Sequence, residues 1–219
     1  MSLKLYFAPG ACSFVPHTLL ETAGEPFEPV LVKLHKGENK TPEYKALNPR
    51  AQVPVLVDGN EVITQIVAIV NYLDERFPQC KFLPRESLAR TRALEKLAWM
   101  NNTAHPTFTH VFMPHKFAAS AEAQAEIKTF NAALYASLLG ELEAMAVSAA
   151  GQGAPYLGGA QFGPLDAYAL TLLRWGGFAG HDPHGYPALW ALVQRVAALP
   201  AVARAIERER LQLNVYKPA

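Results

Sequence analysis

The stretch NPRAQVPVLVDGNEVIT, residues 48–64, places two apolar runs on either side of Asp58-Gly59. An Asp-Gly pair between apolar runs is a strong signal for a tight turn joining antiparallel strands. Pro54 opens the first run: a cis Val53-Pro54 bond would turn the backbone of Val53 outward toward a ligand, whereas a trans proline opening an edge strand is commoner. The stretch therefore predicts a β-hairpin with a candidate ligand contact at its start.

A βαβ unit is predicted upstream of this hairpin. Residues 3–7, LKLYF, alternate apolar and polar positions as a strand does and end at Pro9-Gly10. A short helix follows, with Ser13 as its expected cap and Gly24 as its stop. Residues 29–34, PVLVKL, have the composition of a second strand.

The hairpin is followed by apolar residues at helical spacing in QIVAIVNYLDERF, residues 65–77. The first eighty residues therefore predict a βαβ–ββα order around a mixed four-stranded sheet. Strand signals then vanish, and long segments rich in Ala and Leu predict helices near 87–116, 121–148, 164–178, 187–199 and 201–210. We expect an α/β domain over 1–80, a linker over 81–86 and an all-helical domain over 87–219.

Composition narrows the class of partner. The 219 residues carry 20 Lys+Arg and 19 Asp+Glu, a formal net charge of +1, so no global field draws the chain to nucleic acid or an anionic membrane. No run approaches the roughly 18 apolar residues of a spanning helix, and the N-terminus lacks a signal peptide's apolar centre. We expect a cytoplasmic protein with a small-molecule partner, in which the two cysteines stay reduced.

Cys12 follows the predicted Pro9-Gly10 turn and stands at the predicted start of a helix. A helix N-terminus offers free N–H groups and a partial positive charge, which favour the nucleophilic thiolate. The alternative from the stretch alone is a small, half-buried residue that fills a tight corner. Because no second cysteine stands at the C-x-x-C spacing, a dithiol redox cycle is not expected.

The histidines do not indicate a metal site. His105, His110 and His115 recur every five residues, so on a helix successive rings point about 140° apart and cannot meet at one ion. His181 and His184 share a loop without an evident third ligand. We therefore expect no bound metal.

The order of these features resembles the glutathione transferase superfamily over essentially the whole chain. More narrowly, YFAPGACSFVPH (6–17), LNPRAQVPVL (47–56) and FGPLDAYALTLLRW (162–175) are similar to the bacterial beta class, in which a cysteine occupies the place that tyrosine or serine holds elsewhere. The resemblance implies a thioredoxin-like domain that binds glutathione, a helical second domain, and a homodimer that packs one subunit's first domain against the other's second.

The resemblance also implies roles for individual residues. Cys12 is expected to hydrogen-bond or form a mixed disulfide with the glutathione sulfur, and the backbone of Val53, beside a cis Pro54, to pair with the cysteinyl part of the tripeptide. Lys36 stands where a lysine approaches the glycine carboxylate, although a solvated surface lysine is an equal alternative. His105, in WMNNTAHPTF (99–108), matches a histidine that assists catalysis as donor or general base; the alternative is a packed helix residue.

The chain departs from the family pattern at Gln65-Ile66, at Pro106 and at Ala98, where the family has an asparagine. Gln65-Ile66 stands where a carboxylate and a small residue usually grip the γ-glutamyl end, and Pro106 stands where a basic residue is common. Gln65 keeps an acceptor without its charge, and the bulk of Ile66 is expected to crowd the ligand carboxylate, so weaker glutathione binding follows.

Asp166 also matches a family position, that of a helix-capping carboxylate, and is assigned to structure with Gly163 at the cap. The candidates for contact with an electrophile are aromatic residues on the predicted helices: Phe14, Phe108, Phe112 and Trp175.

The predicted function is conjugation of glutathione to small hydrophobic electrophiles, with Cys12 orienting or reversibly binding the glutathione thiol. One alternative is a glutathione-dependent thiol-disulfide reductase that uses Cys12 as a single nucleophile. The other is a binding protein of the same fold that has lost catalysis.

Overall fold

The structure is a computed structural model that describes residues 3–218. Its four-stranded sheet has the order β2-β1-β3-β4, from β1 (Leu3–Phe7), β2 (Phe27–Leu31), β3 (Val55–Asp58) and β4 (Glu61–Thr64). β1 runs parallel to β2 and antiparallel to β3, and β3 and β4 form the hairpin, with Asp58 opposite Glu61. The predicted mixed sheet and βαβ–ββα order are confirmed.

The second strand is displaced from its predicted range. β2 covers Phe27–Leu31 instead of 29–34, with Pro29 at its centre opposite Leu5 of β1. Proline has no N–H to donate, and β2 is an edge strand, where one side of the backbone needs no partner. Pairing ends when the N–H of Val32 donates to Phe7 O at 2.8 Å, after which the chain enters a 3₁₀ turn, Leu34–Lys36.

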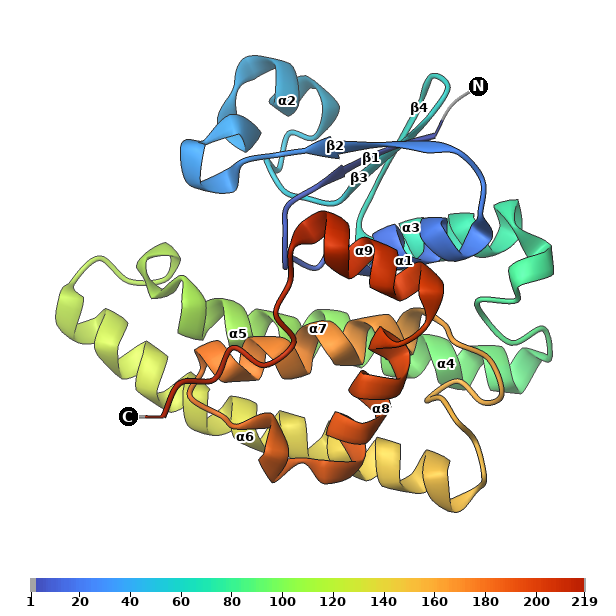
Figure 1. Ribbon diagram of the computed structural model, residues 1–219. Coiled ribbons are helices and arrows are strands. Elements are labelled where there is room, and N and C mark those ends of the chain that lie inside the picture. The colour runs from blue at the N-terminus through green and yellow to red at the C-terminus, as the bar shows by residue number, and fades with distance from the viewer. Residues whose placement is uncertain (1–2, 219) are drawn as a thin grey trace.

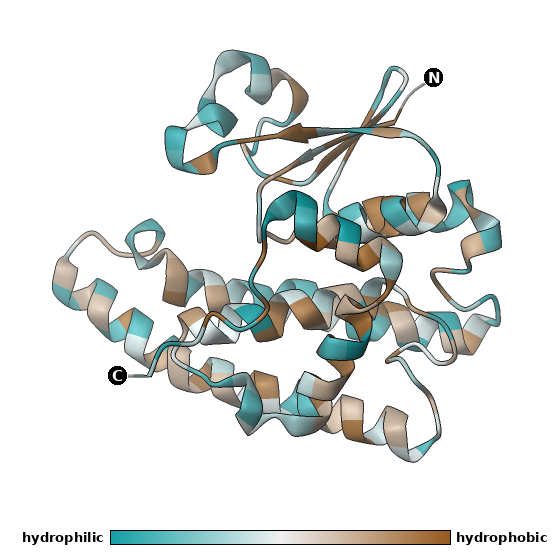
Figure 2. Cartoon of the chain, in the orientation of Figure 1, coloured by the Kyte–Doolittle hydropathy of each residue, from teal (hydrophilic) through white to brown (hydrophobic). Residues whose placement is uncertain are grey.

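Alternation along the strands separates the two faces of the sheet. Leu3, Leu5, Phe7 and Leu56 belong to the main core with α1 (Phe14–Ala23) and α3 (Ile66–Arg76), which pack together below the sheet in Figure 1. On the other face, Val55 packs with Tyr44 of α2 (Pro42–Leu47). The α2 segment is largely hydrophilic in Figure 2, and Tyr44 is its buried residue.

All later elements are helical. They are α4 (Ser87–Trp99), a π-helical turn (Met100–Ala104), α5 (His105–Phe112), α6 (Ala121–Gly151), α7 (Pro164–Phe178), α8 (Pro187–Ala197) and α9 (Pro200–Glu209). The segment predicted as one helix over 87–116 is therefore two helices joined by the π turn, with a 3₁₀ turn at Pro114–Lys116. α7 lies in the middle, buried along nearly its whole length.

The last helix returns to the first domain. α9 packs against α1, and the two lie side by side in Figure 1. Glu21 of α1 receives the Arg204 guanidinium at 2.8 Å and that of Arg208 at 3.0 Å. Residues from opposite ends of the chain therefore form one interface beneath the sheet.

One described helix, α6, is long and apolar enough to cross a membrane by length and hydropathy alone, and the bent pair α8–α9 passes the same test jointly. In the fold, α6 packs on α5, α7 and α8. Tyr135 of α6 donates to Leu172 O at 2.8 Å, and Glu143 accepts the N–H groups of Ala188 and Leu189. These contacts make α6 a member of the helical layer, but only 28% of its most apolar window is buried.

Candidate active site

Cys12 lies in the turn that joins β1 to α1, and Ser13 braces this turn. Ser13 is fully buried; its hydroxyl accepts the N–H of Ala8 at 3.1 Å and donates to Ala8 O at 3.2 Å. Its side chain makes no hydrogen bond to the first turn of α1, so the predicted side-chain cap is wrong. Gly24 ends the helix in the left-handed conformation, as predicted.

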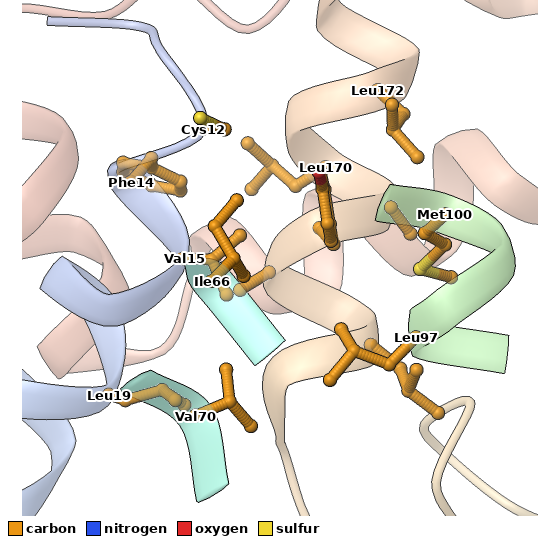
Figure 3. Close-up of a cluster of buried hydrophobic side chains, with 14 of the residues drawn as sticks. Cys12, Phe14, Val15, Leu19, Ile66, Val70, Leu97, Met100, Leu170 and Leu172 are labelled. Carbon is orange, nitrogen blue, oxygen red and sulfur yellow. The ribbon is translucent and has the colours of Figure 1, made fainter. Parts of the chain in front are cut away.

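The Cys12 thiol is buried and donates to Val53 O at 3.6 Å. Burial raises the pKa of Cys12 to about 12, although the N–H groups of Cys12 and Ser13 act in the opposite direction. Desolvation therefore outweighs the helix N-terminus, and the expectation of a favoured thiolate is wrong. Figure 3 shows Cys12 at the edge of a buried apolar cluster that supplies this low-dielectric environment.

Val53 precedes β3, and the Val53-Pro54 peptide bond is cis. The loop before it is held by side chains: the Tyr44 hydroxyl and the Asn48 amide both donate to Gln52 O, at 2.9 and 2.8 Å. Val53 O is thereby presented to Cys12. The structure brings these two predicted site residues together.

Gln65 is the N-cap of α3, and its φ of 72° is unusual for a residue other than glycine. Its exposed side chain makes no capping bond, and the first N–H groups of the helix have no intrahelical acceptor. Ile66 is 3% exposed and points into the core between α1, α3 and α7 (Figure 3). The expected crowding by Ile66 is therefore wrong: its side chain is a core residue.

His105 begins α5 and is largely buried. Its Nδ1 lies 2.8 Å from the Tyr168 hydroxyl, which in turn donates to Asn101 Oδ1 at 3.2 Å. This network assigns the donor hydrogen to Nδ1 and leaves Nε2 as an acceptor. Burial lowers the pKa of His105 to about 4, so the ring is neutral at physiological pH.

Trp175 of α7 connects His105 to the Cys12 turn. The ring centroids of His105 and Trp175 are 4.8 Å apart. Trp175 Nε1 donates to Gly10 O at 2.8 Å. His105 therefore lies one aromatic ring away from the turn that carries Cys12. The four aromatic candidates differ in burial: Phe14, Phe108 and Trp175 are buried, and Phe112 is 57% exposed. The Phe108 ring stacks between those of Trp175 and Phe112.

Two candidates gain no support from contacts. Lys36 is exposed in its 3₁₀ turn, and no hydrogen bond or ion pair of the described residues joins it to Cys12, Val53 or Gln65. Pro106 occupies the first turn of α5 and offers no cation there. Within residues 3–218, no group of three or more potential ligands could hold a metal ion.

Asp166 is structural, as expected. Its carboxylate accepts Gly163 N at 2.9 Å and Leu157 N at 2.8 Å, and burial raises its pKa to about 6. A cavity of about 490 Å³ lies between α4, α6 and the loop 154–159, and one of about 240 Å³ lies against residues 81–85; Cys12 lines neither.

Sequence reasoning missed three polar groups around this site, of which Tyr168 and Glu209 are buried. Tyr168 and Asn101 hold His105, and Glu209 accepts the N–H of Gly10 at 2.8 Å. Asn101 stands four residues before His105, a helical spacing that could have suggested a shared face. Nothing in the sequence signals the contact of Glu209, which is 199 positions from Gly10.

Comparisons with known proteins agree on one family. The model of the glutathione S-transferase N-terminal domain matches residues 1–75. A glutathione S-transferase of Escherichia coli O157:H7 is 31% identical over 96% of this chain and 100% of its own. The bacterial beta-class glutathione S-transferase of Sphingomonas chungbukensis is 30% identical, with a TM-score of 0.82 and coverage of 95% and 100%. A sphingomonad glutathione S-transferase complexed with glutathione is 32% identical, with a TM-score of 0.79 and the same coverage.

Proposed function

Because this chain belongs to the glutathione S-transferase superfamily, we propose that it conjugates glutathione to small hydrophobic electrophiles at the Cys12 turn. Glutathione is the co-substrate, as the relatives crystallised with it support. The observation that carries the proposal is the convergence of the Cys12 thiol and the Val53 carbonyl, 3.6 Å apart, at the start of β3. A backbone edge beside a thiol suits an extended, cysteine-containing peptide.

In the proposed complex, the cysteinyl part of glutathione pairs with the backbone of Val53 and displaces the Cys12 thiol from Val53 O. Cys12, neutral because its pKa is about 12, then donates its S–H hydrogen to the glutathione sulfur. Gln65 and the free N–H groups that open α3 receive the γ-glutamyl end. Lys36 is the proposed contact for the glycine carboxylate.

The reaction needs a thiolate on glutathione and an electrophilic carbon beside it. The glutathione thiol releases its proton to solvent water, its sulfur attacks the carbon and forms the C–S bond, and the leaving group departs with its bonding pair. A hydrogen bond from Cys12 stabilises the negative sulfur. His105, which is neutral because burial lowers its pKa to about 4, assists as a hydrogen-bond acceptor at Nε2. Of the stacked rings of Phe108, Phe112 and Trp175, the exposed Phe112 offers the apolar surface for the electrophile, and the two buried rings support it.

We also propose that the protein is a cytoplasmic homodimer active in detoxification. Apolar side chains remain exposed on β4, α4 and α6, among them Leu88 at 62% and Phe130 at 72%. On α6, Leu134 follows Phe130 by one helical turn and is 41% exposed. Large exposed apolar side chains of this kind support an interface with a second copy.

The experiment compares wild type with Cys12→Ala in two assays: conjugation of glutathione to 1-chloro-2,4-dinitrobenzene, and glutathione-dependent reduction of a small disulfide. We expect conjugation by wild type and a partial loss in Cys12→Ala, since a hydrogen-bond donor is removed but glutathione supplies the nucleophile. Disulfide reduction that depends wholly on Cys12, without conjugation, would favour the reductase. Inactivity in both assays together with glutathione binding would favour the binding protein.

A further inference from the structure

Gly10, in the turn before Cys12, is hydrogen-bonded to the helical domain through both its N–H and its carbonyl. Gly10 donates its N–H to Glu209 Oε2 at 2.8 Å, and its carbonyl accepts Trp175 Nε1 at 2.8 Å. Gly10 has a φ of 70°, a left-handed conformation that favours glycine. Helices α7 and α9 therefore both form hydrogen bonds with a turn that belongs to the sheet domain.

The same glutamate also holds the helix that follows Cys12. Glu209 Oε1 accepts from His17 Nδ1 of α1 at 2.6 Å, and both side chains have no exposed surface. His17 packs against the rings of Phe7 and Phe27, and its Nε2 has no hydrogen-bond partner among the described residues. A single carboxylate thus joins the chain two residues before Cys12 and five residues after it.

Neither the transferase proposal nor the packing of the domains requires this contact. Two ion pairs, of Glu21 with Arg204 and with Arg208, also link α1 to α9 one helical turn beyond His17. Neither ion pair includes a residue of the Cys12 turn. The two carboxylate oxygens of Glu209 bond to residues on either side of Cys12 in the chain, Gly10 and His17.

We propose that Glu209 is a positioning residue, which places the Cys12 thiol at Val53 O by anchoring Gly10 and His17 at once. Its role in catalysis rests on the proposed function, but its role in placing the thiol does not. Without the carboxylate, the buried His17 Nδ1 and the part-buried Gly10 N–H lose their acceptor, and the turn relaxes away from the position that buries Cys12.

The test compares Glu209→Gln with the matched control Glu21→Gln. Glutamine keeps the volume of Glu209, but its amide offers one acceptor and one donor in place of two acceptors, so both hydrogen bonds survive only if the His17 ring changes tautomer and accepts at Nδ1. The control removes a buried carboxylate from the same α1–α9 interface and leaves the Cys12 turn untouched. The primary measurement is the rate of Cys12 alkylation by iodoacetamide, which needs neither glutathione nor activity, with thermal unfolding in parallel.

We expect alkylation of Cys12 to rise about tenfold in Glu209→Gln and to stay within about twofold of wild type in Glu21→Gln. Loss of the Glu209 charge also favours the thiolate, because this charge raises the pKa of Cys12. Trp175→Phe, which releases the same turn without removing a charge, separates the two causes. In the conjugation assay, we expect kcat to fall in Glu209→Gln with little change in the electrophile's KM. Equal alkylation rates in the two variants would overturn the proposal, as would an unchanged rate in Glu209→Gln.

A second variant covers the case in which Glu209→Gln does not fold. Trp175→Phe keeps an aromatic ring in the stack but removes the donor to Gly10 O, so it releases the other polar group of the same glycine. We expect faster Cys12 alkylation here too, and an unchanged rate would contradict the account of the turn. If conjugation is absent in wild type while alkylation follows this pattern, the proposed function fails and the positioning role stands.

Discussion

The burial of Cys12 leads to a quantitative prediction about its reactivity. Alkylation requires the thiolate, and a pKa raised from 9.0 to about 12 lowers the thiolate fraction at pH 7.5 from about 3% to about 0.003%. We therefore expect Cys12 in the ligand-free protein to react about a thousandfold more slowly with iodoacetamide than an unperturbed cysteine of pKa 9.0. Restricted access to the buried sulfur adds to this protection.

The assay follows intact mass and peptide mapping over time. A Cys80→Ser variant removes the other thiol, which is only partly buried, and leaves a single reporter. The same variant in denaturant gives the unprotected rate. A native rate within about tenfold of the denatured rate would refute the reasoning, because neither the raised pKa nor the burial could then hold.

Three further predictions concern the surrounding residues. Replacing Gln65 by Glu should tighten glutathione binding about fivefold to tenfold in a calorimetric titration, because a charged acceptor gains ~1 kcal/mol over a neutral one for the ligand's ammonium; unchanged affinity would show that Gln65 does not face the ligand. The imidazole NMR signals of His105 should stay constant from pH 8 to pH 5 and titrate near 4. Because the pKa of His105 is lower in the folded than in the unfolded state, its contribution to the free energy of unfolding is complete above pH 6.5. About 3 kcal/mol of that contribution is lost as the pH falls from 6.5 to 4. A midpoint near 6.5 would contradict that burial. Replacing Asp166 by Ala should lower the free energy of unfolding in urea by about 2 to 4 kcal/mol, because two buried N–H groups lose their acceptor; a loss below about 1 kcal/mol would mean that water replaces the carboxylate.

Local patterns were sufficient to predict most of the fold. The alternation of residues 3–7, the Asp58-Gly59 turn and the later helical segments are each local signals, and each element exists in the structure. β2 was misplaced because a strand's ends depend on its partner: the register with β1 puts Phe27 opposite Leu3. Pro29 looked like a strand start, but on an edge strand it is tolerated at the centre.

The site was predictable only where chemistry and neighbours are close in sequence. Their turns made Cys12 and Val53 candidates with open alternatives, the resemblance to the glutathione transferase superfamily assigned both to one site, and the structure joins them. The protonation state of Cys12 could not be predicted from the sequence, because its burial depends on the packing of distant helices. The effect of burial on the pKa outweighs that of the local N–H groups. Ser13 illustrates the same limit: its hydroxyl looked like a cap but bonds to both polar groups of Ala8. The partners of His105 and Gly10 come from helices that only the fold brings near.

The central claim is that the Cys12–Val53 edge binds glutathione despite the uncharged Gln65. The most direct measurement is an isothermal calorimetric titration of the purified full chain with reduced glutathione. We predict saturable binding of one glutathione per chain, weaker than low micromolar because the γ-glutamyl end meets an amide instead of a carboxylate. An absence of binding at millimolar glutathione would contradict the account.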